Sequence, residues 1–194
     1  MKGIPYWHPS LYRLAMKIIR KKTYIKKYQY LKEEIGERTT LDIGCGDCEL
    51  ARYIKKENYE GWDINQPFVK EAQKRGLNVF LKDVMKEKIP KKECILFSEV
   101  LHHLQPEYKK IVKEAVEKAD KVIIIEPTKH LATSKNKILA AIGKKCNNAG
   151  QKEKIIQPIS KEELKELERE MEGKGKEMGD LYIIVIENEK SKTR

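Results

Sequence analysis

Short apolar runs alternate with helix-like stretches along most of this chain of 194 residues. Runs of five or six residues, rich in aliphatic and aromatic side chains, predict strands at residues 39–43, 59–64, 77–82, 94–98 and 121–126. The stretches between them predict helices at residues 47–57, 67–75 and 106–119. The last run, KVIIIE, is typical of a strand buried on both faces of a parallel sheet. Strands that alternate with helices predict βαβ units and a doubly wound α/β fold.

The last part of the chain departs from this alternation of strands and helices. Ser160 followed by Glu163 matches a capping box, and Leu164 and Leu167 then share one face of a predicted helix. The run at residues 180–187, DLYIIVIE, predicts one more strand. A helix, a glycine-containing turn and a closing strand can complete the sheet with an antiparallel strand.

A basic amphipathic helix is predicted before the first strand. Ser10 can cap it, and apolar residues recur at three- to four-residue spacing between Leu11 and Leu31, with a gap at Lys21-Lys22. Between residues 2 and 27 there are eight basic residues and no acidic one. Such a helix can lie on a membrane surface or grip a polyanion. It can also pack its apolar face on the sheet, which is the interpretation we favour for that face.

The composition is that of a globular protein. Apolar residues make up 40% of the chain and charged residues 37%, enough for a core and a solvated surface. No apolar run approaches the roughly 20 residues that span a bilayer, so we expect no transmembrane segment. The first ten residues lack the apolar core of a secretory signal, so we expect a cytoplasmic protein.

The net charge of +11 is unevenly distributed. Residues 1–40 carry +7 and residues 131–161 carry +6, whereas residues 41–130 carry only +1. Two basic segments of this kind indicate an anionic partner, such as RNA or an anionic surface. The alternative is that the lysines only solvate helices, as in the Lys/Glu-rich proteins of thermophiles.

Cys45 and Cys48 form a C-x-x-C motif, which in other proteins serves redox chemistry or zinc binding. A structural zinc site needs four ligands, and no second such pair follows in the sequence. We therefore expect no metal site at this motif.

The first chemical signal is the turn LDIGCGD after the first predicted strand. Gly44 and Gly46 let the backbone approach a ligand closely. The dinucleotide fingerprint G-x-G-x-x-G would place a third glycine where this chain has Glu49. Asp42 would also repel a diphosphate at this point. Both features disfavour a nicotinamide-dependent oxidoreductase.

Polar residues end the next three predicted strands. Asp63 lies 19 residues after Gly44, where a carboxylate can accept both hydroxyls of a ribose. Asp83 can accept a hydrogen bond from an adenine amino group, and Ser98 and Glu99 end the fourth strand. The carboxyl ends of parallel strands meet at one edge of the sheet, where open α/β sheets bind ligands. The ordered series therefore predicts a ligand site at this edge.

The motifs LDIGCGD, GWDIN, LKDV and FSEVLHHL, in this order and spacing, resemble those of class I, Rossmann-like S-adenosylmethionine-dependent methyltransferases. The resemblance covers roughly residues 39–126. It implies a mainly parallel seven-stranded sheet with an antiparallel last strand. It also implies S-adenosylmethionine as the cofactor, with these cofactor-binding residues: Asp42, Gly44, Cys45, Gly46, Asp63, Ile64, Asp83, Val84 and Ser98.

The same resemblance suggests how one domain of residues 1–194 is organised. We expect an N-terminal helical cap at residues 1–38 and a cofactor-binding core at residues 39–126. A basic insertion at residues 127–160 and a closing helix and strands at residues 161–194 would follow.

Methyl transfer needs few catalytic groups, because the sulfonium methyl is already activated and the acceptor mainly has to be held in line. His102, His103 and Glu99 are the candidate catalytic residues, since histidine titrates near neutral pH and can act as a base. The alternative is that the histidines orient the helix start or the cofactor.

FSEVLHHL lacks the Asn/Asp-Pro-Pro-aromatic and Pro-Cys motifs of DNA methyltransferases. It is similar to the group that acts on small molecules, lipid-linked quinones or tRNA. We therefore predict an enzyme with a small-molecule or metabolite-like acceptor. The close alternative is a tRNA or rRNA methyltransferase in which the basic segments 1–32 and 131–161 flank one cleft. A non-catalytic S-adenosylmethionine-binding or scaffold protein is disfavoured, because the motifs are intact. The sequence predicts no particular oligomeric state.

Overall fold

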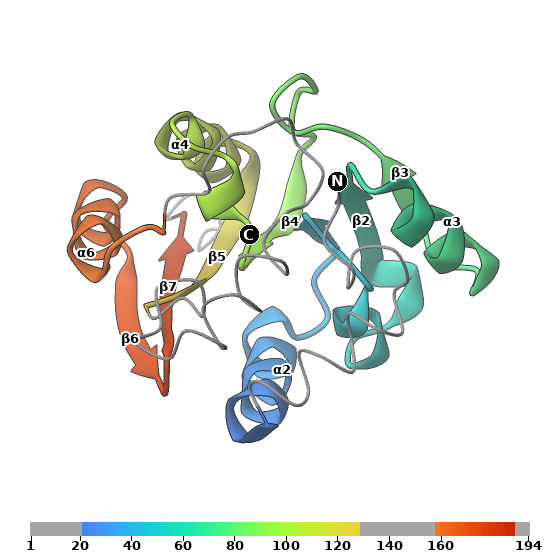
Figure 1. Cartoon of the computed structure of the whole chain (residues 1–194), viewed down its shortest axis with the longest axis horizontal. Helices are drawn as coiled ribbons and strands as arrows, with labels where there is room; N and C mark the ends of the chain where they lie inside the picture. Colours follow the sequence, from blue (N-terminus) through green and yellow to red (C-terminus); the bar gives the residue numbers. More distant parts are fainter. Residues whose placement is uncertain (1–20, 129–157, 189–194) are drawn as a thin grey trace, which may run out of the picture.

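A seven-stranded sheet forms the centre of the computed structural model, which describes residues 21–128 and 158–188 (Figure 1). The strand order is β3-β2-β1-β4-β5-β7-β6, and β7 runs antiparallel to both of its neighbours while the other pairs are parallel. This confirms the predicted doubly wound, mainly parallel α/β sheet with an antiparallel last strand. The strands are β1 (Thr40–Ile43), β2 (Tyr59–Asp63), β3 (Val79–Leu81), β4 (Lys92–Ser98), β5 (Ala119–Pro127), β6 (Lys174–Met178) and β7 (Leu181–Glu187).

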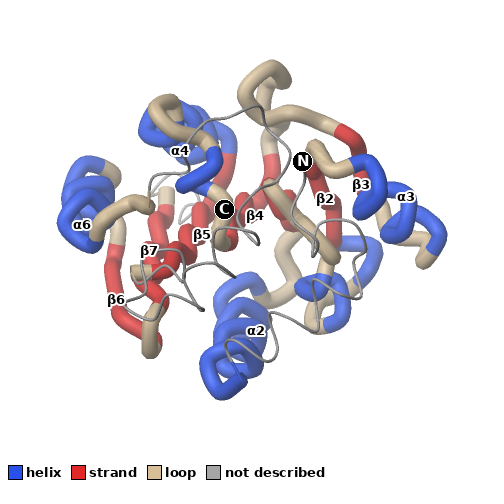
Figure 2. The backbone as a smooth tube through the Cα atoms, in the orientation of Figure 1, coloured by secondary structure: helices blue, strands red, loops and turns tan. Residues whose placement is uncertain are grey.

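Helices cover both faces of this sheet (Figure 2). Buried residues of α4 and α6 belong to one hydrophobic cluster, and buried residues of α2 and α3 belong to a second cluster on the opposite face. The helices are α2 (Lys21–Ile35), α3 (Gln66–Lys74), α4 (Tyr108–Lys118) and α6 (Lys161–Glu170). Among the described helices, none is long and apolar enough to cross a membrane.

The alternation along β5 explains why its residues 122–125 are all apolar. Val122 and Ile124 pack in the cluster under α4 and α6, whereas Ile123 and Ile125 pack in the cluster under α2 and α3. Successive side chains of a strand point to opposite faces, and here both faces are covered. Residues 122–125 of this strand therefore need apolar side chains on both faces, as the KVIIIE run predicts.

The helix predicted at residues 47–57 is wrong. The structure has two short 3₁₀ turns there, Glu49–Arg52 and Lys56–Asn58. Cys48 adopts a left-handed conformation with φ of 55°, so the backbone turns away from the helical path before Glu49. Local apolar spacing could not reveal this, because the turn geometry depends on how the loop meets the ends of β1 and β2.

Some of the predicted strand boundaries are also wrong. β3 is shorter than the predicted run of residues 77–82, and β4 and β5 each begin two residues earlier than predicted. β6 carries the polar, exposed sequence KGKEM and has no apolar alternation that would identify it.

The predicted N-terminal helix is described only from Lys21 onward, as α2. In that part Tyr24, Tyr28, Leu31 and Ile35 are buried on one face against the sheet. The proposed start at Ser10 and most of the basic segments 1–32 and 131–161 lie outside the described residues.

The capping box at the start of α6 is confirmed. The Ser160 hydroxyl accepts a hydrogen bond from the Glu163 N–H at 3.2 Å, and the Glu163 carboxylate accepts one from the Ser160 N–H at 2.7 Å. This cap fixes where α6 begins and so places Leu164 and Leu167 in the core.

Replacing the cap should destabilise the closing part of the fold. Ser160→Ala is expected to lower the free energy of unfolding in urea by about 1 kcal/mol, because an N–H group at the helix start loses its partner. Ser160→Asp, which keeps an acceptor at the cap, should stay close to wild type. Equal stability of the Ala and Asp variants would show that the capping box contributes little.

Candidate active site

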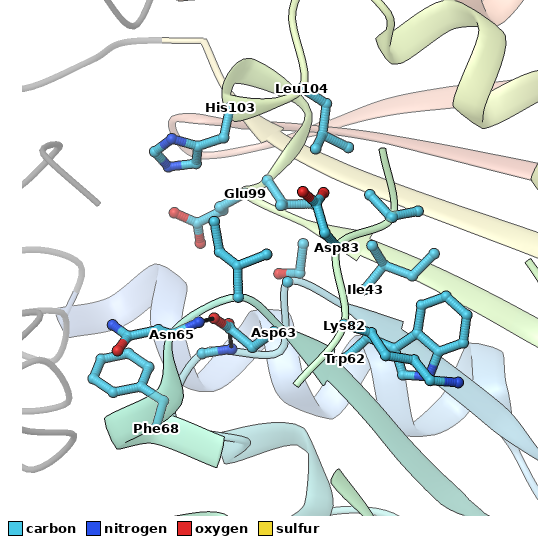
Figure 3. Close-up of a pocket in the computed structure, with 16 residues that line it drawn as sticks. Ile43, Trp62, Asp63, Asn65, Phe68, Lys82, Asp83, Glu99, His103 and Leu104 are labelled. Carbon is cyan, nitrogen blue, oxygen red and sulfur yellow. Dashed lines mark hydrogen bonds between the residues drawn. The ribbon is translucent and has the colours of Figure 1, made fainter. Parts of the chain in front are cut away.

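Two adjoining cavities open at the carboxyl ends of the parallel strands, one of about 100 Å³ and one of about 40 Å³. The first cavity is lined by residues from all four predicted strand ends, including Gly44, Asp63, Asp83 and Ser98 (Figure 3). Gly46, Ile64, Val84, Glu99 and His103 also line it. The second cavity lies between this edge and α2, and contains Asp42 and Cys45. Gly44, Gly46, Ser98 and Glu99 line both cavities, so the two form one continuous candidate site.

The loop after β1 is pressed against the ends of β2 and β4. The N–H groups of Gly44 and Cys45 both donate to the Trp62 carbonyl, at 2.8 and 3.1 Å. Gly44 has a φ of +70°, and a Cβ there would lie 2.4 Å from a methyl of Val100. Only glycine therefore lets the backbone pass between these strand ends and form the wall of both cavities.

Asp63 is held in place by the same loop. One of its carboxylate oxygens accepts the Gly46 N–H at 2.8 Å, and the other accepts the Asn65 N–H at 2.7 Å (Figure 3). Two backbone donors fix the plane of the carboxylate at the wall of the first cavity. The structure thus places Asp63 where the sequence predicts a ligand-binding acid.

Asp83, Val84 and the exposed Ile64 also line the first cavity. The Asp83 carboxylate accepts the Met85 N–H at 3.0 Å, which ties it to its own turn. The Lys82 ammonium lies 4.3 Å from the centre of the Trp62 ring. Apolar side chains and oriented acceptors thus occur together here, a combination that suits a flat heteroaromatic ring.

Asp42 lies in the second cavity and is almost fully buried, with 4% of its surface exposed. Its carboxylate accepts a hydrogen bond from the Tyr59 hydroxyl at 3.0 Å. Burial raises the pKa of Asp42 to about 7, and the Tyr59 hydrogen bond and the positive charge of Lys27 only partly oppose this shift. Such a site favours a ligand that brings its own positive charge.

Cys45 also lines the second cavity rather than the first. The thiol of Cys48 lies 3.6 Å from the Cys45 sulfur, and both residues are buried. This hydrogen bond and burial raise the pKa of the Cys45 thiol well above its usual value. In the described residues there is no group of three or more His, Cys, Asp or Glu placed to hold a metal ion.

The two candidate histidines occupy different positions. The Nδ1 atom of buried His102 lies 2.7 Å from a carboxylate oxygen of Glu126, whose other oxygen accepts the Leu101 N–H at 2.6 Å. His103 lines the first cavity, and its ring lies 4.2 Å from that of His102 (Figure 3). His103 is therefore the histidine that faces the site, while His102 is fixed from behind by Glu126.

Glu99 stands where the two cavities meet and has a left-handed backbone, with φ of 59°. Its carboxylate lies 3.0 Å from the ammonium group of Lys27 in α2. The sequence did not single out Lys27 or Glu126. A charged residue inside the apolar run of β5 was a usable signal for Glu126, but Lys27 is one of many lysines in a basic helix.

The strand order and the antiparallel β7 are those of the class I, Rossmann-like methyltransferase fold, and the cavities lie at the carboxyl ends of its parallel strands. Residues 41–123 match the sequence model of a family described as methyltransferase domain. The chain is an S-adenosylmethionine-dependent methyltransferase.

Solved structures share this fold at low sequence identity. A possible histamine N-methyltransferase from Thermotoga maritima has a TM-score of 0.63 and 15% identity, over 89% of this chain and 92% of that one. Magnesium protoporphyrin IX methyltransferase from Synechocystis, with bound S-adenosylhomocysteine, has a TM-score of 0.58 and 15% identity, over 84% of this chain and 82% of that one. A chain of the Pnkp1/Rnl/Hen1 RNA repair complex has a TM-score of 0.57 and 17% identity, over 86% of this chain but only 42% of that one. No curated protein sequence matches the chain significantly.

Asp42 should make stability depend on pH. Because its pKa in the folded state is about 7, the folded protein keeps a proton that the unfolded chain releases above about pH 4. The folded state therefore loses stability as the pH rises from about 4 to 7, and the loss is constant above that range. In urea denaturation, the advantage of Asp42→Asn over wild type should grow across the same range and then level off.

Asp120→Asn, at an exposed position of β5, is the matched control and should show no such trend. A stability difference between Asp42→Asn and wild type that does not change with pH would contradict the buried, protonated state of Asp42.

Proposed function

We propose that this methyltransferase transfers the methyl group to a small-molecule or metabolite-like acceptor. The observation that carries the proposal is the charge of the site. Its described lining contains six carboxylates but only two lysines, Lys27 and Lys82. A phosphate backbone that lies along this edge would be repelled by its net negative charge, whereas a neutral or cationic small molecule would not be repelled. The six acids are Asp42, Asp47, Glu49, Asp63, Asp83 and Glu99.

The two cavities suit the two ends of the cofactor. In our proposal, Asp63 accepts the ribose hydroxyls, and Ile64, Asp83 and Val84 surround the adenine in the first cavity. The fixed carboxylate of Asp63 and the apolar wall beside Asp83 support this assignment.

The second cavity would then take the amino-acid end. Asp42 would face the positive charge of the cofactor there. Burial raises the pKa of this carboxyl group, and a nearby positive charge would stabilise its charged form, which supports the assignment. Gly44 and Gly46 would let the backbone approach the cofactor where the two cavities join. Cys45 lines the second cavity there, and Ser98 lines both.

Catalysis in this proposal depends on positioning. When bound, S-adenosylmethionine supplies an activated sulfonium methyl group. Glu99 and His103 would orient the acceptor, and holding reacting groups in line can contribute roughly 7–11 kcal/mol without any proton transfer. A base is needed only if the acceptor must lose a proton, and His103 is better placed for that role than His102 because it lines the cavity.

Two of the similar structures are named for small acceptors. The Synechocystis enzyme is a magnesium protoporphyrin IX methyltransferase, and the Thermotoga protein is a possible histamine N-methyltransferase. Their resemblance to this chain is one of fold, so they support the class of acceptor rather than a particular molecule.

RNA is the second candidate acceptor. A chain of an RNA repair complex shares the fold, and the sequence concentrates positive charge in segments 1–32 and 131–161. If these segments bind RNA, replacing Lys21, Lys22, Lys144 and Lys145 with glutamine should weaken acceptor use and leave cofactor affinity intact. Wild-type acceptor use should then fall steeply with salt. Acceptor kinetics that do not change across a salt series would contradict RNA binding through these segments.

Labelled-methyl transfer into fractionated cell extract tests the acceptor class. We expect the label in the metabolite pool, because the site is acidic and the cavities are small. A label that appears only in the RNA pool would overturn the small-molecule proposal in favour of the second candidate.

Cofactor contact can be tested by calorimetry. Wild type should bind S-adenosylmethionine and not NAD, and Asp63→Ala should weaken S-adenosylmethionine binding by about tenfold to 100-fold, because charge-assisted hydrogen bonds are lost. Asp120→Ala, away from the site, should bind as wild type does. Unchanged affinity in Asp63→Ala would contradict the placement of the ribose.

A further inference from the structure

Two buried thiols meet at the wall of the second cavity. The Cys48 sulfur lies 3.6 Å from the Cys45 sulfur. Cys45 lines the cavity and keeps 8% of its surface exposed, whereas Cys48 is fully buried behind the lining. A small oxidant in this cavity therefore reaches Cys45 first, and finds a second sulfur close to it. A reactive thiol beside a resolving thiol is the arrangement that redox-sensitive cysteines share.

The backbone brings the two cysteines close enough for a disulfide bond. The Cys48 N–H donates to the Cys45 carbonyl at 2.9 Å, which closes the turn of residues 45–48. The end Cα atoms of such a four-residue turn lie within about 7 Å of each other, and disulfides usually join Cα atoms about 4.4–6.8 Å apart. The bond then requires the two sulfur atoms to move from 3.6 Å to about 2.05 Å apart.

The same turn carries contacts of the candidate cofactor site. Gly46 lies between the two cysteines, and its N–H holds the Asp63 carboxylate at 2.8 Å (Figure 3). The Cys45 sulfur packs against Gly61 of β2, where a Cβ would lie 2.8 Å from this sulfur and 3.0 Å from the Tyr59 hydroxyl. In such close packing the sulfur atoms cannot approach each other without moving the turn. Closing the disulfide should therefore displace Gly46 and loosen its hydrogen bond to Asp63.

We propose that Cys45 and Cys48 form a disulfide on oxidation, and that this bond lowers the affinity of the site for S-adenosylmethionine. The coupling is reciprocal, so the bound cofactor stabilises the dithiol form. The pair is thus an oxidation site that switches cofactor binding. This inference rests on the proposed placement of the amino-acid end of the cofactor in the second cavity.

The oxidation proceeds in two balanced steps with hydrogen peroxide as the oxidant. The Cys45 thiolate attacks one peroxide oxygen, the O–O bond breaks, and a sulfenic acid forms while the released hydroxide takes up a proton to give water. The Cys48 sulfur then attacks the Cys45 sulfur, the S–O bond breaks, and a second water leaves. The two thiols lose two electrons and two protons, and a dithiol reductant reverses the change. The hydrogen bond with Cys48 and burial raise the pKa of the Cys45 thiol, so the reaction should accelerate as the pH rises.

Peroxide treatment followed by calorimetry with S-adenosylhomocysteine tests the switch without knowledge of the acceptor. A Cys146→Ser background leaves Cys45, Cys48 and the buried Cys94 as the cysteines of the chain. Peptide mass spectrometry should find a disulfide between residues 45 and 48. The oxidised protein should bind S-adenosylhomocysteine about tenfold or more weakly than the reduced protein, and dithiothreitol should restore the affinity.

Cys48→Ala is the specific variant, because it removes the second sulfur and keeps the residue that lines the cavity. Its reduced form should bind S-adenosylhomocysteine within about twofold of the parent, and peroxide should cause no tenfold loss. Cys48→Ser serves if the Ala variant does not fold. Cys94→Ala is the matched control, since it removes a buried thiol outside the pair and should respond to peroxide as the parent does.

The reduction potential of the pair gives an independent readout. In glutathione buffers, saturating S-adenosylhomocysteine should raise the midpoint potential, because the ligand binds the dithiol form more tightly. A tenfold difference in affinity corresponds to a rise of about 30 mV for this two-electron couple.

The outcomes separate the switch from the cofactor site. If peroxide produces no disulfide between residues 45 and 48, or if Cys48→Ala loses affinity as the parent does, the switch is overturned. A disulfide that leaves both the affinity and the midpoint potential unchanged overturns it as well. In these cases the reduced protein still binds S-adenosylhomocysteine, and the proposed function is untouched. If the reduced parent does not bind this ligand, the proposed cofactor placement fails and the switch fails with it.

Discussion

The close approach of the loop after β1 to the ends of β2 and β4 is the constraint on which the site depends. Gly44 passes Val100 without room for a Cβ, and its N–H donates to the Trp62 carbonyl. The next turn brings the Gly46 N–H to Asp63. These contacts exist because β1 lies between β2 and β4, where the strand order reverses its direction and an open α/β sheet forms its ligand crevice. A side chain at position 44 would displace the wall of both cavities at once.

Electrostatics give this crevice its character. Acids gather at the strand ends, and burial makes the charged form of Asp42 unfavourable until a positive partner arrives. Lys27 reaches the same place from α2, and its aromatic and acidic neighbours offset the cost of burying it. The near-neutral sum over residues 41–130 therefore conceals a locally acidic edge. The positive excess of the chain lies instead in residues 1–40 and 131–161.

Much of the fold could be predicted because it depends on local patterns. The apolar run at residues 122–125 of β5, the cap at Ser160 and the acids at strand ends each follow from side-chain chemistry at fixed spacing. The prediction of a helix at residues 47–57 failed because Cys48 has a left-handed backbone, which the spacing of apolar residues does not report. Lys27 and Glu99 meet across 72 positions, and His102 and Glu126 across 24. No single-sequence pattern reports such pairs, so these pairings became visible only in the structure.

The central claim is that both cavities form one cofactor site divided near Glu99. A crystal structure of the protein in complex with S-adenosylhomocysteine tests this claim most directly. We expect the adenosine in the first cavity with its ribose hydroxyls bonded to Asp63, and the amino-acid end in the second cavity beside Asp42. An adenosine bound elsewhere on the protein, or an amino-acid end that leaves the second cavity empty, would contradict this account.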